Sequence, residues 1–194
     1  MKEDVLEQLV DDYLKLNGYF TRHNIKFAPK KDHPEFASKA DSVGSDIDVI
    51  GFNPTKRPPE NVWVVSCKSW QSGFDAGWWA KNAATDKETS GREAWKFFRE
   101  LVKPKWTEAF LHEVKLLTGS TSFTYVTAVT RLRGNRSLWE NHAELRLAIG
   151  DNPIRIRTLE EMFASIQEKT STTPAASEIG RLVQLLKSAE LLKK

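Results

Sequence analysis

The spacing of apolar residues predicts that helices and strands alternate along this chain. In residues 3–16, apolar side chains recur at three- and four-residue steps, which indicates an amphipathic helix, and Asn17-Gly18 supplies the turn that ends it. Residues 19–27 are predicted to form a strand, and the proline-, lysine- and aspartate-rich residues 28–45 a loop. Two further strands are predicted at 46–52 and 62–68.

The second half of the chain is richer in helical patterns. Residues 92–103 place basic side chains on one stripe, which predicts a helix that ends or kinks at Pro104, and residues 106–117 predict another that Gly119 closes. The β-branched and aromatic residues 122–130 predict an interior strand. Helices are then predicted at 138–149, 159–168 and 179–192, with a short strand at 154–157 and a linker at 170–177.

This order of elements predicts an α/β sandwich, in which helices flank a mixed central β-sheet with an αβββαβ core. We expect one domain over residues 1–169. Residues 170–194 are predicted to be a linker and a C-terminal helix, which either packs on the same domain or forms a dimer interface.

Composition narrows the class of protein. The chain has 194 residues, of which 40% are hydrophobic and 28% charged, so it can bury a core of ordinary size. With one cysteine, the chain cannot form an internal disulfide. A net charge of +3 does not by itself indicate nucleic-acid binding, so any such surface must be inferred from how the charged residues are distributed. No apolar run approaches the roughly 18 residues of a membrane span, and the N-terminus lacks a signal-peptide core. We therefore expect a cytoplasmic protein with no membrane partner.

Polar residues cluster where two of the predicted strands adjoin. The apolar run 62–65 ends in Ser66, Cys67 and Lys68, and Asp46 and Asp48 lie in the preceding strand. A two-residue period places Ser66 and Lys68 on one face with Cys67 on the other, and it places Asp46, Asp48 and Ile50 on one face of their strand. Because an unpaired buried ammonium is costly, we expect Lys68 to lie beside Asp48 and Ser66.

Asp48 and Lys68, with Glu7 on the first helix, suit metal-assisted hydrolysis. Carboxylates hold Mg²⁺ or Mn²⁺, and the metal lowers the pKa of a bound water. A nearby lysine can orient that water or stabilise negative charge in the transition state. The alternatives are a structural ion pair for Lys68 and a solvated position for Glu7 on the flank of its helix.

Asp-(x)17-Ser-x-Lys after an apolar strand, with a glutamate on the first helix, resembles the PD-(D/E)XK nuclease superfamily, which has the restriction-endonuclease-like fold. The resemblance covers residues 3–130. It implies Asp48 and Glu7 as metal ligands, the main-chain carbonyl of Cys67 as another, and Lys68 as the lysine of the tripeptide. It further implies a Mg²⁺- or Mn²⁺-dependent endonuclease that hydrolyses duplex or branched DNA, and a homodimer is one expected assembly.

Ser66 departs from the family pattern, which has Asp or Glu at this position. A neutral hydroxyl is a weaker ligand for a dication than a carboxylate. Three interpretations remain: Ser66 serves as a tolerated ligand, Asp46 compensates for it, or the site has decayed and the protein only binds nucleic acid. An interaction domain without DNA affinity is a further alternative.

Basic and aromatic residues provide candidate contacts to nucleic acid. Phosphates are expected to be bound by Gln71, Arg92, Lys96, Arg99, Arg131, Arg133 and Arg136. Trp70, Trp78 and Trp79 could stack on bases or belong to the core, and the core is favoured for Trp79. Basic stripes are also common on solvated surfaces, so this surface is a hypothesis that depends on the catalytic cluster.

Overall fold

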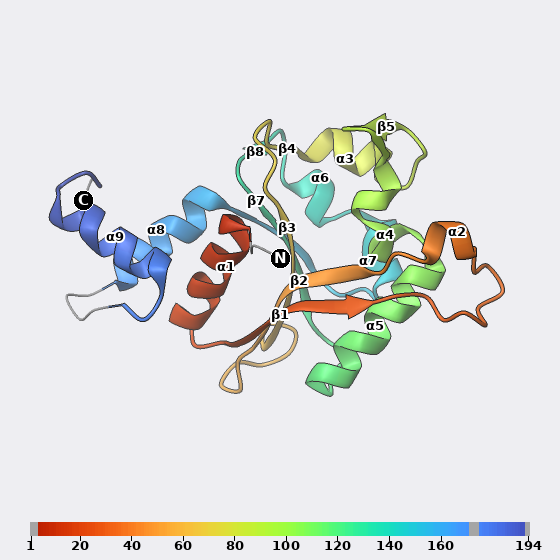
Figure 1. Ribbon diagram of the computed structural model, residues 1–194, viewed down its shortest axis with the longest axis horizontal. Coiled ribbons are helices and arrows are strands. Elements are labelled where there is room, and N and C mark those ends of the chain that lie inside the picture. The colour runs from red at the N-terminus through yellow and green to blue at the C-terminus, as the bar shows by residue number, and fades with distance from the viewer. Residues whose placement is uncertain (1–3, 171–174, 193–194) are drawn as a thin grey trace.

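The computed structural model describes residues 4–170 and 175–192, and it has a mixed α/β fold with helices on both sides of a central sheet (Figure 1). The elements of the sheet and of its two helical layers follow in chain order. They are α1 (Val5–Leu16), β1 (Phe20–Phe27), α2 (Ser38–Asp41), β2 (Ser45–Phe52), β3 (Val62–Lys68), α3 (Ala76–Asn82), α4 (Arg99–Val102), α5 (Pro104–Thr118), β7 (Thr124–Val129), α6 (Ser137–Glu140), α7 (Ala143–Ala148), β9 (Ile154–Thr158), α8 (Leu159–Lys169) and α9 (Glu178–Ser188).

The central sheet has five strands in the order β1-β2-β3-β7-β9. The first three strands pair antiparallel, and β7 and β9 are added parallel to β3. Strands β3 and β7 therefore lie inside the sheet, as their continuous apolar sequences predicted. Two small two-stranded sheets accompany it, β4 (Phe74–Asp75) with β8 (Leu132–Arg133) and β5 (Glu88–Thr89) with β6 (Arg92–Glu93).

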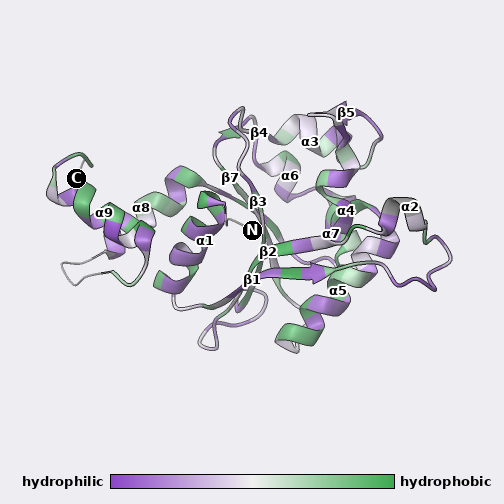
Figure 2. Cartoon of the chain, in the orientation of Figure 1, coloured by the Kyte–Doolittle hydropathy of each residue, from purple (hydrophilic) through white to green (hydrophobic). Residues whose placement is uncertain are grey.

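Each face of the sheet has its own apolar core. Trp63, Val65 and Val126 face the layer of α1 and α8, which α9 extends outward (Figure 1). Val64 and Tyr125 face the opposite layer, to which α5, α6 and the aromatic side chains after β3 contribute. Figure 2 shows hydrophobic and hydrophilic bands alternating along α1, α5 and α9, as expected of helices with one buried face.

The sheet parts at one end, between β2 and β3. Strand β2 pairs with β1 down to Ser45, whereas its pairing with β3 ends at Val49, opposite Val65. Strand β3 instead continues along β7 as far as Lys68. The beginning of β2 and the end of β3 thus diverge, and Asp48 and Ser66 lie where they separate.

The alternation predicted for β2 is broken at this point. Ile47 and Ile50 pack into the same apolar cluster, although a regular strand would turn them to opposite faces. The prediction that Asp46, Asp48 and Ile50 share one face is therefore wrong. On the neighbouring strand, Asn24 has a left-handed φ of 52°, which bends the ribbon of β1 and β2.

The predicted helix over 92–103 is absent. Strand β6 occupies its start, a 3₁₀ turn (η1) covers Ala94–Phe97, and α4 is one turn long. Phe97, the last residue of the 3₁₀ turn, and Phe98, which follows it, both pack on Trp70 and Trp79, so tertiary packing overrides the helical spacing of the basic residues here. Pro104 begins α5 as its first residue, so it starts a helix as well as separating two.

Two further boundaries differ from the sequence prediction. The helix expected over 138–149 is divided into α6 and α7 by a turn, in which the side chain of His142 caps α7. The predicted linker lies partly outside the described residues. The helix that follows it packs against α1 and α8, with Val183 buried and the Ser177 hydroxyl donating to Asp12.

Among the described residues, no helix is long and apolar enough to cross a membrane.

Candidate active site at the parted sheet

Asp48 occupies the gap between the diverging strands. Its Oδ2 accepts a hydrogen bond of 2.5 Å from the main-chain N–H of Cys67. Beyond the last main-chain pair of β2 and β3, Val49 with Val65, the two strands are thus joined by a side chain. Burial raises the pKa of the Asp48 carboxyl from its ordinary 3.8 to about 6, against the opposing effects of the Lys68 ammonium and the Cys67 N–H. Asp46 and Glu100 raise this pKa further, so three carboxylates act on one another here.

Ser66 and Lys68 lie together on one face of β3, as predicted. The Lys68 ammonium donates to Ser66 Oγ over 2.7 Å and lies 5.0 Å from the centre of the Phe98 ring. Its charge also acts on the Asp48 carboxyl. The expected neighbourhood of Asp48, Ser66 and Lys68 is thus present in the fold.

Glu100, in α4, is a site residue that the sequence did not indicate. Only 7% of it is exposed, and its Oε1 accepts a 2.5 Å hydrogen bond from the hydroxyl of Tyr125 in β7. The Ser66 hydroxyl lies near that of Tyr125 and acts to lower the pKa of Tyr125. A chain of four polar side chains therefore runs from Lys68 through Ser66 and Tyr125 to Glu100, with hydrogen bonds joining the first two and the last two.

This chain gives Ser66 a specific role. Its hydroxyl accepts a hydrogen bond from the Lys68 ammonium and keeps an O–H of its own near Tyr125, whose hydroxyl donates a hydrogen bond to Glu100. An ionised carboxylate at position 66 could only accept. Ser66 thus lies between the lysine and the buried carboxylate of Glu100.

Cys67 and Glu7 lie toward the opposite face of the sheet. The Cys67 side chain packs, partly buried, in the cluster with α1 and α8, as expected for the residue between Ser66 and Lys68. Burial raises the pKa of its thiol, and Asp48 and Glu7 add to this effect. Glu7 therefore lies close enough to the end of β3 to influence Cys67.

Asp46 forms a 2.6 Å ion pair with Lys26.

The donor groups suit a small, hard cation. Asp48 and Glu100 are two carboxylates that interact electrostatically across a partly buried space, and a dication would offset the cost of ionising both. Magnesium commonly takes one or two protein carboxylates and completes its shell with water and phosphate. Within residues 4–170 and 175–192, no group of three or more His, Cys, Asp and Glu side chains is arranged to hold a metal. Water and substrate would have to supply the remaining ligands.

The predicted phosphate-binding residues do not form one surface. Because the 92–103 helix is absent, Arg92, Lys96 and Arg99 do not share a stripe. Lys96 pairs with Glu93, and the Arg99 guanidinium lies 4.4 Å from the centre of the Trp106 ring. Burial lowers the pKa of Arg99.

The residues predicted from the loop after β7 are also divided. Arg131 and Arg133 are exposed, whereas Arg136 is bound to Glu161 over 2.6 Å. Gln71 is exposed and lines the same hollow as Arg133. The candidate contacts that remain available lie beyond the end of β3, close to Trp70 and Trp78.

No protein-family model matches this chain, and no curated protein matches it. One solved structure that matches is the crystal structure of a protein of unknown function, AF1548, with 15% sequence identity and a TM-score of 0.36. The match covers 95% of this chain and 77% of the other. A similarity at this level supports no conclusion about function, and the chain is characterised by its own architecture, a five-stranded mixed sheet between two layers of helices.

Proposed function

We propose that this protein is a metal-dependent nuclease that hydrolyses DNA phosphodiester bonds at the parted end of the sheet. The observation that supports this most is the convergence of Asp48, Lys68 and Glu100, which arrive from β2, β3 and α4. The resemblance of residues 3–130 to the restriction-endonuclease-like fold is consistent with this proposal. The exposed Arg131 and Arg133 near the end of β3 are consistent with it as well.

Each residue of the cluster has a distinct task in this proposal. Asp48 and Glu100 would hold Mg²⁺ or Mn²⁺, which supplies an acidified water and neutralises charge on the phosphate. Lys68 has three N–H bonds, of which one is used by Ser66, so the others can hold a water or a phosphate oxygen. Tyr125 fixes the position of Glu100, and Ser66 fixes the ammonium of Lys68.

The reaction is a hydrolysis in which a water oxygen bonds to phosphorus and the bond to one ester oxygen breaks. The attacking water must lose a proton and the leaving oxygen must gain one. The Lys68 ammonium, positioned by Ser66, can stabilise the negative charge that develops between these two events. Partial burial of Asp48 and burial of Glu100 strengthen such electrostatic interactions, because little water screens them.

The test is cleavage of plasmid and single-stranded DNA with Mg²⁺ or Mn²⁺, by the parent and by Asp48→Asn, Glu100→Gln and Lys68→Ala. We expect cleavage by the parent, a loss of at least about 100-fold in each variant, and no change in Lys15→Ala, an exposed lysine on α1. Salt-sensitive DNA binding without cleavage would replace this function with a non-catalytic binding role. If the parent neither binds nor cleaves DNA, both the nuclease and the binding role are refuted.

A further inference from the structure

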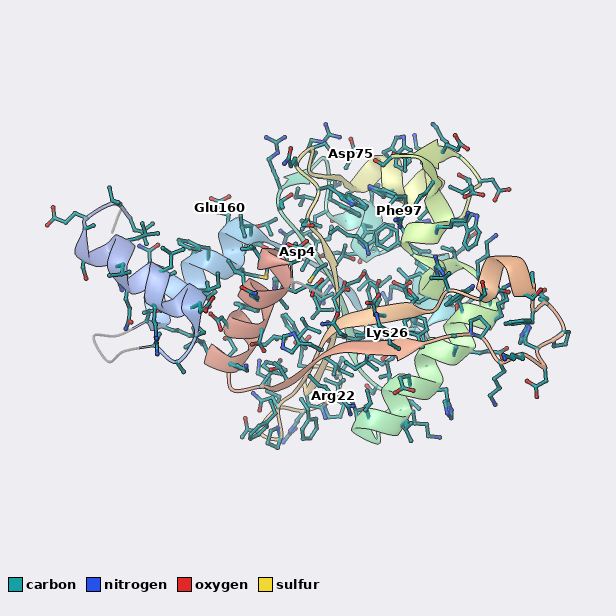
Figure 3. The ribbon with its side chains drawn as sticks, in the orientation of Figure 1. Asp4, Arg22, Lys26, Asp75, Phe97 and Glu160 are labelled. Atoms are coloured by element: carbon teal, nitrogen blue, oxygen red, sulfur yellow. The ribbon has the colours of Figure 1, made fainter. Side chains whose placement is uncertain are left out.

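A second feature adjoins the candidate active site, at the point where the chain leaves β3. A cavity of about 640 Å³ opens between residues 70–79, the hairpin of β5 and β6, and the loop that contains Arg133. Figure 3 labels Asp75 and Phe97, two residues of its wall, near α3. This volume is within the range of about 300–1,000 Å³ that is usual for pockets that bind small organic groups.

Aromatic rings form much of the wall. Trp70 and Trp79 stack at 4.8 Å with an angle of 24°, and Phe97 meets both rings edge-on. Trp79 and Phe74 are buried, and their stacked rings form the inner side of this cluster. Trp70, Trp78 and Phe97 are only partly buried, so parts of their rings face the cavity.

The cavity and the candidate active site share this aromatic cluster. The Lys68 ammonium lies 5.0 Å from the centre of the Phe98 ring, and Phe98 in turn contacts Trp70 at 6.4 Å and Trp79 at 5.2 Å between ring centres. Trp70 follows Lys68 by two residues and lines the cavity. A ligand that places a phosphate at Lys68 therefore has its adjoining group next to this wall.

Charged side chains of both signs lie around the opening, where Lys87 and Arg133 are accompanied by Asp75 and Glu88. The Lys87 ammonium lies 5.4 Å from the centre of the Trp78 ring, and Arg92 lies 5.7 Å from that of Phe97. Arg133 lies 3.9 Å from Asp75, which is only partly buried, and Gln71 adds an amide. The flat rings inside can stack on a planar base, and Lys87 and Arg133 at the rim can contact the phosphodiester chain that carries it.

We infer that this cavity receives an unpaired base of the DNA strand whose phosphodiester lies at Lys68. The inference rests on the proposed function and specifies its substrate: single-stranded DNA, or duplex DNA with a base out of the stack. Removing a base from a fully paired helix costs a few kcal/mol, whereas a single strand or an unpaired position avoids most of this cost. A fully paired duplex is therefore the poorer ligand.

Binding to oligonucleotides that contain one 2-aminopurine tests this, with the full chain and with EDTA so that no cleavage occurs. We expect single strands and duplexes with one unpaired 2-aminopurine to bind at least about 10-fold more tightly than the paired duplex, with a change in its fluorescence on binding. Trp78→Ala should weaken single-strand binding by about 10-fold, and Trp78→Phe should restore most of it. Trp95→Ala, a partly buried tryptophan outside the cavity, is the matched control and should bind as the parent does.

Equal affinity for paired and unpaired DNA, or equal binding by Trp78→Ala and the parent, would overturn the inference. If Trp78→Ala does not fold, Lys87→Glu on the exposed rim replaces it, with the same expected loss of binding. The two proposals fail separately. A parent that binds unpaired bases but never cleaves would refute the nuclease alone, and cleavage unaffected by Trp78→Ala would refute the base site alone.

Discussion

Asn24 in β1 lies directly opposite Asp48 in β2. Their neighbours pair as His23 with Val49 and Ile25 with Ile47, so these two residues face each other across the ribbon. Asn24 adopts a left-handed φ of 52°, a conformation that asparagine tolerates better than most residues. The bend it introduces coincides with the position at which β2 leaves β3, and it directs Asp48 toward the main chain of Cys67.

The bend can be tested through Asn24 itself. Asn24→Gly should keep the stability of the parent within about 0.5 kcal/mol, because glycine adopts positive φ at little cost. Asn24→Val should lose about 1–3 kcal/mol, since a β-branched residue is strained in this region. Urea unfolding of the three proteins measures the difference, and equal losses for Gly and Val would show that the side chain of Asn24, not its backbone, matters.

The raised pKa of Asp48 predicts how stability depends on pH. Between pH 3.8 and about 6 the folded protein retains a proton that the unfolded chain has lost, so stability falls as the pH rises through this window. Asp48→Asn removes this ionisation. Relative to the parent, it should gain about 1–3 kcal/mol in free energy of unfolding between pH 4 and pH 7, after allowance for partial exposure of the carboxyl. Parallel stability curves for the two proteins would contradict the assignment.

Metal binding should be visible without any reaction. A dication that binds only the folded state, at a concentration ten times its dissociation constant, adds about 1.4 kcal/mol to the free energy of unfolding. This raises the midpoint of thermal unfolding by about 3–5 °C in a protein of this size. We expect this shift with Mg²⁺ or Mn²⁺ in the parent and its loss in Asp48→Asn and in Glu100→Gln. A shift that persists in both variants would locate the metal elsewhere.

The position of Ser66 between Lys68 and Tyr125 makes a prediction about Ser66→Glu, which introduces the carboxylate that the resemblance leads one to expect. In the otherwise unchanged protein, this substitution would place a new carboxylate near Glu100 and remove the hydroxyl beside Tyr125. We expect this variant to lose stability by about 1–3 kcal/mol and to cleave DNA no better than the parent.

In the Glu100→Gln background the same substitution should restore the thermal shift with metal, and part of the cleavage, because one carboxylate then replaces the other. Differential scanning fluorimetry and the plasmid assay report the two effects. Failure of Ser66→Glu to rescue Glu100→Gln would show that the two positions are not interchangeable. A gain of activity in the otherwise unchanged parent would favour the decayed site.

The order of elements and the first half of the site could be predicted from the sequence. The apolar run of β3 that ends in Ser66, Cys67 and Lys68 identified an interior strand and the face of each of its last residues. Asp48 and Lys68 were brought together by simple strand geometry, because their strands are adjacent in the chain and in the sheet. These are local patterns, and local patterns are what periodicity detects.

Glu100 could not have been predicted in this way. It lies in a segment that has helical spacing of basic residues but folds as a strand, a 3₁₀ turn and one helical turn, since packing of Phe97 and Phe98 on one aromatic cluster overrides propensity. Its contact with Tyr125 joins residues 25 positions apart, and no spacing rule encodes it. The one available signal was Ser66 in place of Asp or Glu, and the compensating residue that the sequence offered was Asp46, which pairs with Lys26 in the structure.

The parting of the sheet also bears on the order in which the protein folds. Asp48 lies in β2, which pairs antiparallel with β1 and β3, its neighbouring strands along the chain. Glu100 and Tyr125 depend on the crossover that brings β7 parallel to β3, a long-range contact whose loop-closure entropy must be overcome. The carboxylate pair therefore exists only once the crossover has docked, and a chain stalled at the antiparallel strands would have Asp48 without its partner. Formation of the Asp48–Glu100 pair thus reports the last stage of folding, and on the proposed function it is also the step that completes the active site.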